Sequence, residues 1–177
     1  MVEYLTQAIV LNSRPQKEND RIVDIYTKNF GRLNVRVIGG RRILSKLAPH
    51  LDTFNMVTVR LVEKNQITVT DVMTDERFGK ERQDPIFYPS ALKIISLVRS
   101  LTPLAAPDAR LWYHLAKNLK TGGGDIATLL KIFGYDPMQA SCDSCGNSPV
   151  KFFRIKDQSF FCGNCGLKWG TDGLIYL

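Results

Sequence analysis

The sequence RLNVRVIGGRRILSK, residues 32–46, joins a regular β pattern to a basic loop. Its first six residues alternate strictly between polar and apolar side chains, which predicts a strand with one buried face and one outward face. The buried side chains would be Leu33, Val35 and Val37. The outward side chains would be Arg32, Asn34 and Arg36. The two glycines that follow allow a sharp exit from the strand.

Four more short β runs surround this strand, at residues 5–11, 21–27, 56–62 and 66–72. They are rich in Val, Ile and Thr, and the short polar segment at residues 63–65 suits a hairpin loop. Five antiparallel strands with one longer connection, residues 39–52, are typical of an OB-type barrel. A small SH3-like barrel would produce similar signals.

The apolar period changes from two to between three and four near residue 75. This spacing predicts three helices, at residues 88–101, 108–119 and 125–133. Gly122–Gly124 should separate the last two, because a run of three glycines disfavours a helix. Asp125 is placed to cap the third helix and Gly134 to end it.

Four cysteines form two matching hooks, C-D-S-C-G at residues 142–146 and C-G-N-C-G at residues 162–166. Paired C-x-x-C hooks separated by 16 residues are the sequence form of a tetrahedral four-cysteine zinc site. The metal would be structural, since four thiolates leave no open position for a substrate. The predicted ligands are Cys142, Cys145, Cys162 and Cys165. Gly146 and Gly166, which end the two hooks, can take a positive φ, and this should let the chain turn around the metal. A two-strand ribbon is expected between the hooks.

These patterns predict an α+β chain in three parts. An OB-type five-stranded β-barrel would occupy residues 1–79, a helical domain residues 80–141, and a zinc-binding finger or ribbon residues 142–177.

Positive charge is concentrated in the first part of the chain. The net charge of the 177 residues is +7, and residues 14–46 contain nine Lys or Arg against three Asp or Glu. Such a field favours a polyanion, most often nucleic acid, although a solvated basic face is the alternative. No apolar stretch is long enough to span a bilayer, and the first residues lack the basic segment of a secretory signal, so we expect a cytoplasmic protein.

The residues disfavour an enzyme. The basic loop lacks the G-K-[ST] ending of a P-loop, and G-x-G-x-x-G is absent. Neither His50 nor His114 is followed two residues later by Glu, as a nucleobase deaminase requires. A clamp that follows a phosphate polymer explains the loop better than a nucleotide pocket, while a basic turn that only aids solubility remains the plainer alternative.

The chain resembles the RecO family of recombination mediators. The resemblance runs through the E-x-D-R unit at residues 18–21, G-R at 31–32, G-G-R-R-x-x-S-K at 39–46, and LLKIFGYDPMQASCDSCG at 129–146. Members of that family usually continue for several helices beyond the finger, whereas this sequence ends eleven residues after Gly166. We therefore expect a short member without those helices.

The resemblance implies an OB fold that binds single- and double-stranded DNA and anneals complementary strands without ATP. It implies RecR as a partner, with RecF, RecA and single-strand-binding protein in the same machinery, and a nucleoid-associated location. The predicted DNA-binding residues, including Asn34 from the strand face, are Arg14, Lys17, Arg21, Arg32, Asn34, Arg36, Arg41, Arg42 and Lys46. An RNA-binding or ribosome-associated OB protein with a zinc ribbon, and a structural adapter with an incidental basic face, are the alternatives.

Overall fold

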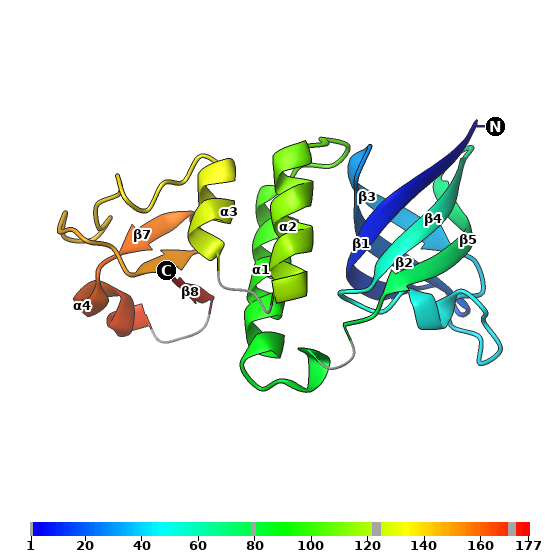
Figure 1. The fold of residues 1–177 in the computed structure, drawn as a ribbon, viewed down its shortest axis with the longest axis horizontal. Helices are drawn as coiled ribbons and strands as arrows, with labels where there is room; N and C mark the ends of the chain where they lie inside the picture. The colour runs from blue at the N-terminus through cyan, green and yellow to red at the C-terminus, as the bar shows by residue number, and fades with distance from the viewer. Residues whose placement is uncertain (1, 79–80, 122–124, 170–172) are drawn as a thin grey trace.

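The computed structural model describes residues 2–78, 81–121, 125–169 and 173–177. A β-barrel lies at one end of an elongated molecule, helices α1 and α2 lie in the middle, and a small sheet with α3 lies at the other end (Figure 1). The mixed α and β composition and the order of the three parts confirm the sequence prediction.

The first five strands close into a barrel in the order β1-β2-β3-β5-β4. β1 is antiparallel to β2 along one part and to β4 along the other, and β3 meets β5 in a parallel register at Arg36 and Thr68. The strand bounds are β1 Val2–Gln16, β2 Asp20–Thr27, β3 Gly31–Val37, β4 Met56–Glu63 and β5 Ile67–Glu76.

Strict alternation along β3 places its apolar side chains inside the barrel, as predicted. β1 is longer than the predicted run at residues 5–11, because its N-terminal half pairs with β4 and its C-terminal half with β2. A register shift between Val10 and Asn12 marks the place where the strand bends.

The three predicted helices are present, and all of their ends lie within two residues of the expected positions. The Asp125 side chain caps α3 by accepting the Thr128 N–H at 3.1 Å, as predicted, and Gly134 ends it at φ +89°. The predicted break at Gly122–Gly124 lies outside the described residues. Within the described ranges, no helix has the length and apolar character needed to cross a membrane. The helices are α1 Phe87–Leu101, α2 Ala109–Thr121 and α3 Ile126–Ile132; short 3-10 turns occupy Ala48–His50 and Glu81–Gln83.

One buried apolar cluster joins the barrel wall to the helices and the C-terminal sheet, and a separate cluster fills the barrel interior. Tyr26 and Phe54 from the barrel, Leu115 from α2 and Phe153 from the last part all belong to one buried cluster. The predicted boundary at residues 79–80 lies outside the described residues, and the division into three domains stays a prediction.

The C-terminal sheet has three strands in the order β7-β6-β8. β6 and β7 form the predicted ribbon, while β8 was missed because its three residues are too few to show a period. The remaining elements are β6 Phe152–Arg154, β7 Ser159–Phe161, α4 Gly163–Gly166, a 3-10 turn at Leu167–Trp169, and β8 Leu174–Tyr176.

Gly31 fixes how closely the barrel approaches the connection between α1 and α2. Its φ is +70°, and an added Cβ would lie 2.4 Å from the backbone carbonyl of Ala106. The next residue, Arg32, accepts the Ala105 N–H on its carbonyl oxygen at 2.9 Å. A side chain at position 31 would therefore separate these two segments.

We predict that Gly31→Ala lowers the free energy of unfolding by about 3 kcal/mol or more, because it adds a backbone clash to left-handed strain. Gly134→Ala is the matched control, since it has φ +89° but nothing within 4 Å of the added Cβ. Strain alone should cost about 1 kcal/mol there. Urea denaturation measures the free energy of unfolding of both variants. Equal decreases in the two variants would contradict the explanation by close approach at Gly31.

Candidate nucleic-acid interface and metal centre

Five of the nine predicted DNA-binding residues are exposed at one end of the barrel or beside it. They lie at the end of β1, in the β1–β2 turn and in the loop after β3. The two segments touch, because Arg41 donates hydrogen bonds from Nη1 to the carbonyl oxygens of Lys17 and Glu18, both at 3.2 Å. The exposed residues are Arg14, Lys17, Arg41, Arg42 and Lys46.

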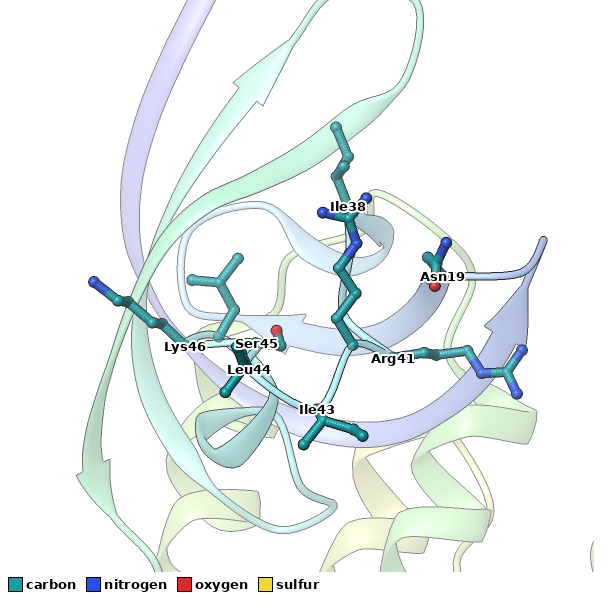
Figure 2. A pocket seen from close by; sticks show the side chains of 10 residues that line it. Asn19, Ile38, Arg41, Ile43, Leu44, Ser45 and Lys46 are labelled. Atoms are coloured by element: carbon teal, nitrogen blue, oxygen red, sulfur yellow. The ribbon is translucent and has the colours of Figure 1, made fainter.

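The loop after β3, residues 38–47, borders a cavity of about 850 Å³. Figure 2 shows Arg41 and Lys46 extending to opposite sides of this loop, with Ile43 and Leu44 between them. No Asp or Glu is among the residues that line the cavity, so the charged side chains in its lining are all cations.

Asp20, at the start of β2, holds this loop in place. One carboxylate oxygen accepts the Gly39 N–H at 2.9 Å, and the other accepts Arg36 Nε at 2.9 Å. The Gly39 N–H, and after it the Arg36 guanidinium, lower the pKa of the Asp20 carboxyl. Sequence reasoning missed this role, although Asp20 belongs to the E-x-D-R unit that carries part of the family resemblance.

The two glycines of the loop serve different purposes. Gly39 has φ +65°, a conformation that side chains disfavour. Gly40 needs space instead, because an added Cβ would lie 2.7 Å from Arg21 Cγ and 2.9 Å from Val37 Cγ1. The predicted sharp exit from the strand is therefore present, and it packs tightly on the barrel.

Arg32, on the outward face of β3, is occupied within the protein. Its guanidinium pairs with Asp24 at 2.8 Å and also donates to the carbonyl oxygens of Arg99 and Thr102. Arg99, from α1, pairs with the same carboxylate at 3.2 Å. Arg32 thus connects the barrel to α1, a partnership that strand periodicity could not reveal.

The other half-buried candidates are Arg21, Asn34 and Arg36. Arg36 is paired with Asp20, and Asn34 lines a small polar cavity of about 170 Å³ beside Arg14 and Arg99. The expectation of a freely exposed basic face on β3 is corrected by these contacts. DNA contact by these residues and by Arg32 stays a prediction.

The four cysteine side chains converge as predicted. Their sulfur atoms all lie within 4.8 Å of one another, and the Cys145 and Cys162 sulfurs are 3.7 Å apart. A tetrahedral zinc with Zn–S bonds of ~2.3 Å separates its ligand sulfurs by about 3.8 Å. The cluster therefore fits a metal ion with four thiolate ligands.

Backbone N–H groups lower the pKa of two of the four cysteines at this centre. Burial raises the pKa of Cys142, but the N–H groups of Cys162, Ser144 and Cys145 outweigh it and lower the pKa to about 6. The same effect of the Cys165 N–H lowers the pKa of Cys162. N–H groups directed at thiolates are the surroundings expected of a metal–thiolate site.

The glycines that end the two hooks differ from each other. Gly146 takes φ +72°, as predicted. Gly166 lies outside the left-handed region, and an added Cβ would lie 2.3 Å from the Phe152 ring. The expectation of a positive φ was wrong for Gly166, since close packing on β6 is what excludes a side chain there.

We predict that Asp20→Asn loosens the loop, because the amide loses the charge that pairs with Arg36. Trypsin should cleave after Arg41 and Arg42 faster than in the parent protein. Asp71→Asn is the control, since within the described residues that exposed carboxylate accepts a hydrogen bond from the N–H of its own neighbour, Val72, and anchors no loop. Equal cleavage rates in both variants would contradict the anchoring role.

The effect of Asp20→Asn should depend on pH. Because the folded pKa of Asp20 is lowered, its stabilisation is complete above the unfolded value of about 3.9 and is lost as pH falls through the folded pKa. The difference in unfolding midpoint between the two proteins should therefore shrink below about pH 4.

Comparison with known proteins supports the resemblance seen in the sequence. Residues 1–73 match the family model described as "Recombination protein O N terminal". The chain is 30% identical to "DNA repair protein RecO" of Syntrophobacter fumaroxidans over 81% of this chain and 62% of that protein. It is 28% identical to the proteins of the same name from Alkaliphilus metalliredigens and Myxococcus xanthus.

The last two similarities cover 90% and 95% of this chain, and 71% and 75% of those relatives. The chain thus spans less than two thirds of the first relative and about three quarters of the others. Because the N-terminal barrel matches the family model and the similarity continues through the helices and the cysteine hooks, this chain is similar to RecO proteins along most of its length.

Proposed function

We propose that this chain acts in DNA repair and recombination as a DNA-binding mediator without a catalytic centre. It would bind single- and double-stranded DNA, anneal complementary strands without ATP, and assist RecA loading together with RecR. The observation that carries the proposal is the exposed cluster of cations on the β1–β2 turn and the loop after β3, held on a closed barrel.

An OB fold is part of this proposal. A five-stranded barrel in the order β1-β2-β3-β5-β4, closed by a parallel contact between β3 and β5, agrees with the Greek-key connectivity of OB folds. In such barrels, strand faces and loops follow a nucleic-acid backbone. The contacts made by Arg32 and Arg36 favour the loops over the strand face here.

We assign phosphate binding chiefly to the five exposed cations. Within the described residues none of the five forms an ion pair, although Arg41 also donates to two carbonyl oxygens of the β1–β2 turn. Arg32, in contrast, would have to break its contacts with Asp24 and α1. Annealing would follow because cations on a surface shared by two strands reduce the repulsion between their phosphates.

Zinc is the metal we propose for the four-cysteine centre. Cys142, Cys145, Cys162 and Cys165 would hold it, and it would supply folding energy rather than a reactive water, because four thiolates complete its coordination. RecR, RecF, RecA and single-strand-binding protein remain proposed partners on the strength of the family resemblance.

We predict that Arg41→Ala/Arg42→Ala weakens DNA binding for all sequences and reduces its salt dependence. If the five exposed cations each contact one phosphate of single-stranded DNA, log K should fall against log[salt] with a slope of roughly −3.5. Removing two contacts should bring the slope to roughly −2. Fluorescence anisotropy titrations between low and moderate salt measure both quantities.

Lys64→Ala/Lys156→Ala is the charge-matched control for that experiment. Both lysines are exposed; one lies in the β4–β5 turn and the other between β6 and β7, away from the basic loop. The control should keep the parent slope. A double mutant at positions 41 and 42 with unchanged affinity and slope would contradict the assignment of the loop.

We predict that Cys142→Ser abolishes binding of one zinc equivalent and removes hydrogen-exchange protection from residues 142–169 and 173–177, since structural zinc contributes on the order of 10 kcal/mol to such modules. Amides of β1–β5 should stay protected, and DNA binding should persist in part. Ser144→Ala, within the same hook, is the control and should retain zinc. If DNA binding is lost completely while the amides of the barrel stay protected from exchange, the zinc finger itself would be the DNA-binding element.

A further inference from the structure

Two large aliphatic side chains stand fully exposed at the tip of the basic loop. The relative exposures of Ile43 and Leu44 are 101% and 91%. They are the two central residues of a turn closed by a hydrogen bond from the Ser45 N–H to the Arg42 carbonyl oxygen, at 3.0 Å. The turn therefore presents both side chains to solvent.

Local folding does not explain these residues. The central positions of turns favour Gly, Pro, Asn, Asp and Ser, whose backbone or side-chain properties stabilise the turn. Neither Ile43 nor Leu44 adds to the barrel core, and exposed apolar side chains gain nothing from water. Ile38, 60% exposed, lines the same cavity, so exposed apolar side chains occur at more than one position of the loop.

The base of the loop is held firmly enough to keep the tip extended. The Arg41 N–H donates to the Asn19 carbonyl oxygen at 2.8 Å, and Asp20 holds Gly39. On the other side, the Ala48 N–H donates to Ser45 Oγ at 3.3 Å. An apolar tip on a fixed base can insert into a partner without first being ordered.

The charges around the tip indicate which partner fits it. Arg41 and Lys46 lie on either side of the two aliphatic residues (Figure 2), and Arg42 directly precedes them in the sequence. No acidic residue is among those that line the cavity. A partner must therefore combine closely spaced negative charges with apolar faces. Single-stranded DNA does so, because each nucleotide carries a phosphate and an unpaired base with an apolar face.

We propose that Ile43 and Leu44 form an aliphatic wedge that packs against the unpaired bases of single-stranded DNA, while Arg41, Arg42 and Lys46 contact the adjacent phosphates. Aliphatic side chains inserted between bases are an established means by which proteins unstack nucleic acids. This inference rests on the proposed DNA-binding function and adds a base contact that is insensitive to salt. The wedge would hold bases apart until a complementary strand pairs with them.

The test compares Ile43→Ser/Leu44→Ser with the parent protein on an oligothymidylate and on an abasic oligonucleotide of the same length. The variant should bind the oligothymidylate about tenfold more weakly at both low and moderate salt, with the slope of log K against log[salt] unchanged. Affinity for the abasic strand should be the same for both proteins, because it offers phosphates without bases.

Two further variants separate the wedge from unrelated effects. Ile43→Met/Leu44→Met keeps the apolar surface and should retain the parent affinity. Met138→Ser changes another exposed apolar residue, 84% exposed and distant from the loop in sequence, and should also leave binding unchanged. Unfolding midpoints equal to that of the parent would show that the serine variant remains folded.

Three results would overturn the wedge. The first is parent-like affinity of the serine variant for the oligothymidylate while Arg41→Ala/Arg42→Ala still weakens binding, which would leave the proposed function intact. The second is an equal loss on normal and abasic strands, which would indicate a distorted loop. The third is unchanged DNA binding with loss of binding to phosphatidylserine vesicles, which would assign the tip to a membrane surface. If neither Ile43→Ser/Leu44→Ser nor Arg41→Ala/Arg42→Ala alters DNA binding, the proposed function itself fails.

Discussion

Closure of the N-terminal barrel depends on the pairing of β1 along both of its edges. One stretch of fifteen residues is antiparallel to β4 in its first half and to β2 in its second, and a bend near Val10 allows the change of partner. With both edges paired, the interior is filled by alternating apolar residues from all five strands. The outer wall is then available to dock helices on one side and to carry the basic loop at one end.

Two carboxylates on β2 divide the basic residues into two groups. Asp24 engages Arg32 and Arg99 where the barrel meets α1, and Asp20 engages Arg36 and the backbone of the loop. Guanidinium groups held in this way stabilise the fold and orient the loop. The remaining cations, on the turn and the loop, have no such partner within the described residues and give the surface its field. Asp20 and Asp24 thus determine which of the basic residues remain exposed to a partner.

The C-terminal part is joined to the rest by packing as well as by its cysteines. Phe153 and Ile175 from its sheet belong to the same buried cluster as the helices and the barrel wall, while Phe161 and Leu174 pack around the cysteines in a separate cluster. A metal at the four sulfurs would therefore support one side of the sheet and the helices the other. This arrangement explains how a segment of 36 residues, too short for a large core of its own, packs against α3.

The sequence by itself determined the features that rest on local periodicity and spacing. Alternation of Leu33, Val35 and Val37 predicted β3, Asp125 and Gly134 predicted the ends of α3, and the spacing of the hooks predicted convergence of four sulfurs. Only the tertiary structure decided which charged residues are free, because a hydrogen bond between Asp24 and Arg99 joins positions 75 residues apart. The same holds for the clash that excludes a side chain at Gly166 and for the exposed tip at Ile43 and Leu44. Periodicity shows which face of a helix or strand is apolar. The residues that contact its polar face come from distant segments of the chain, so only the folded structure reveals them.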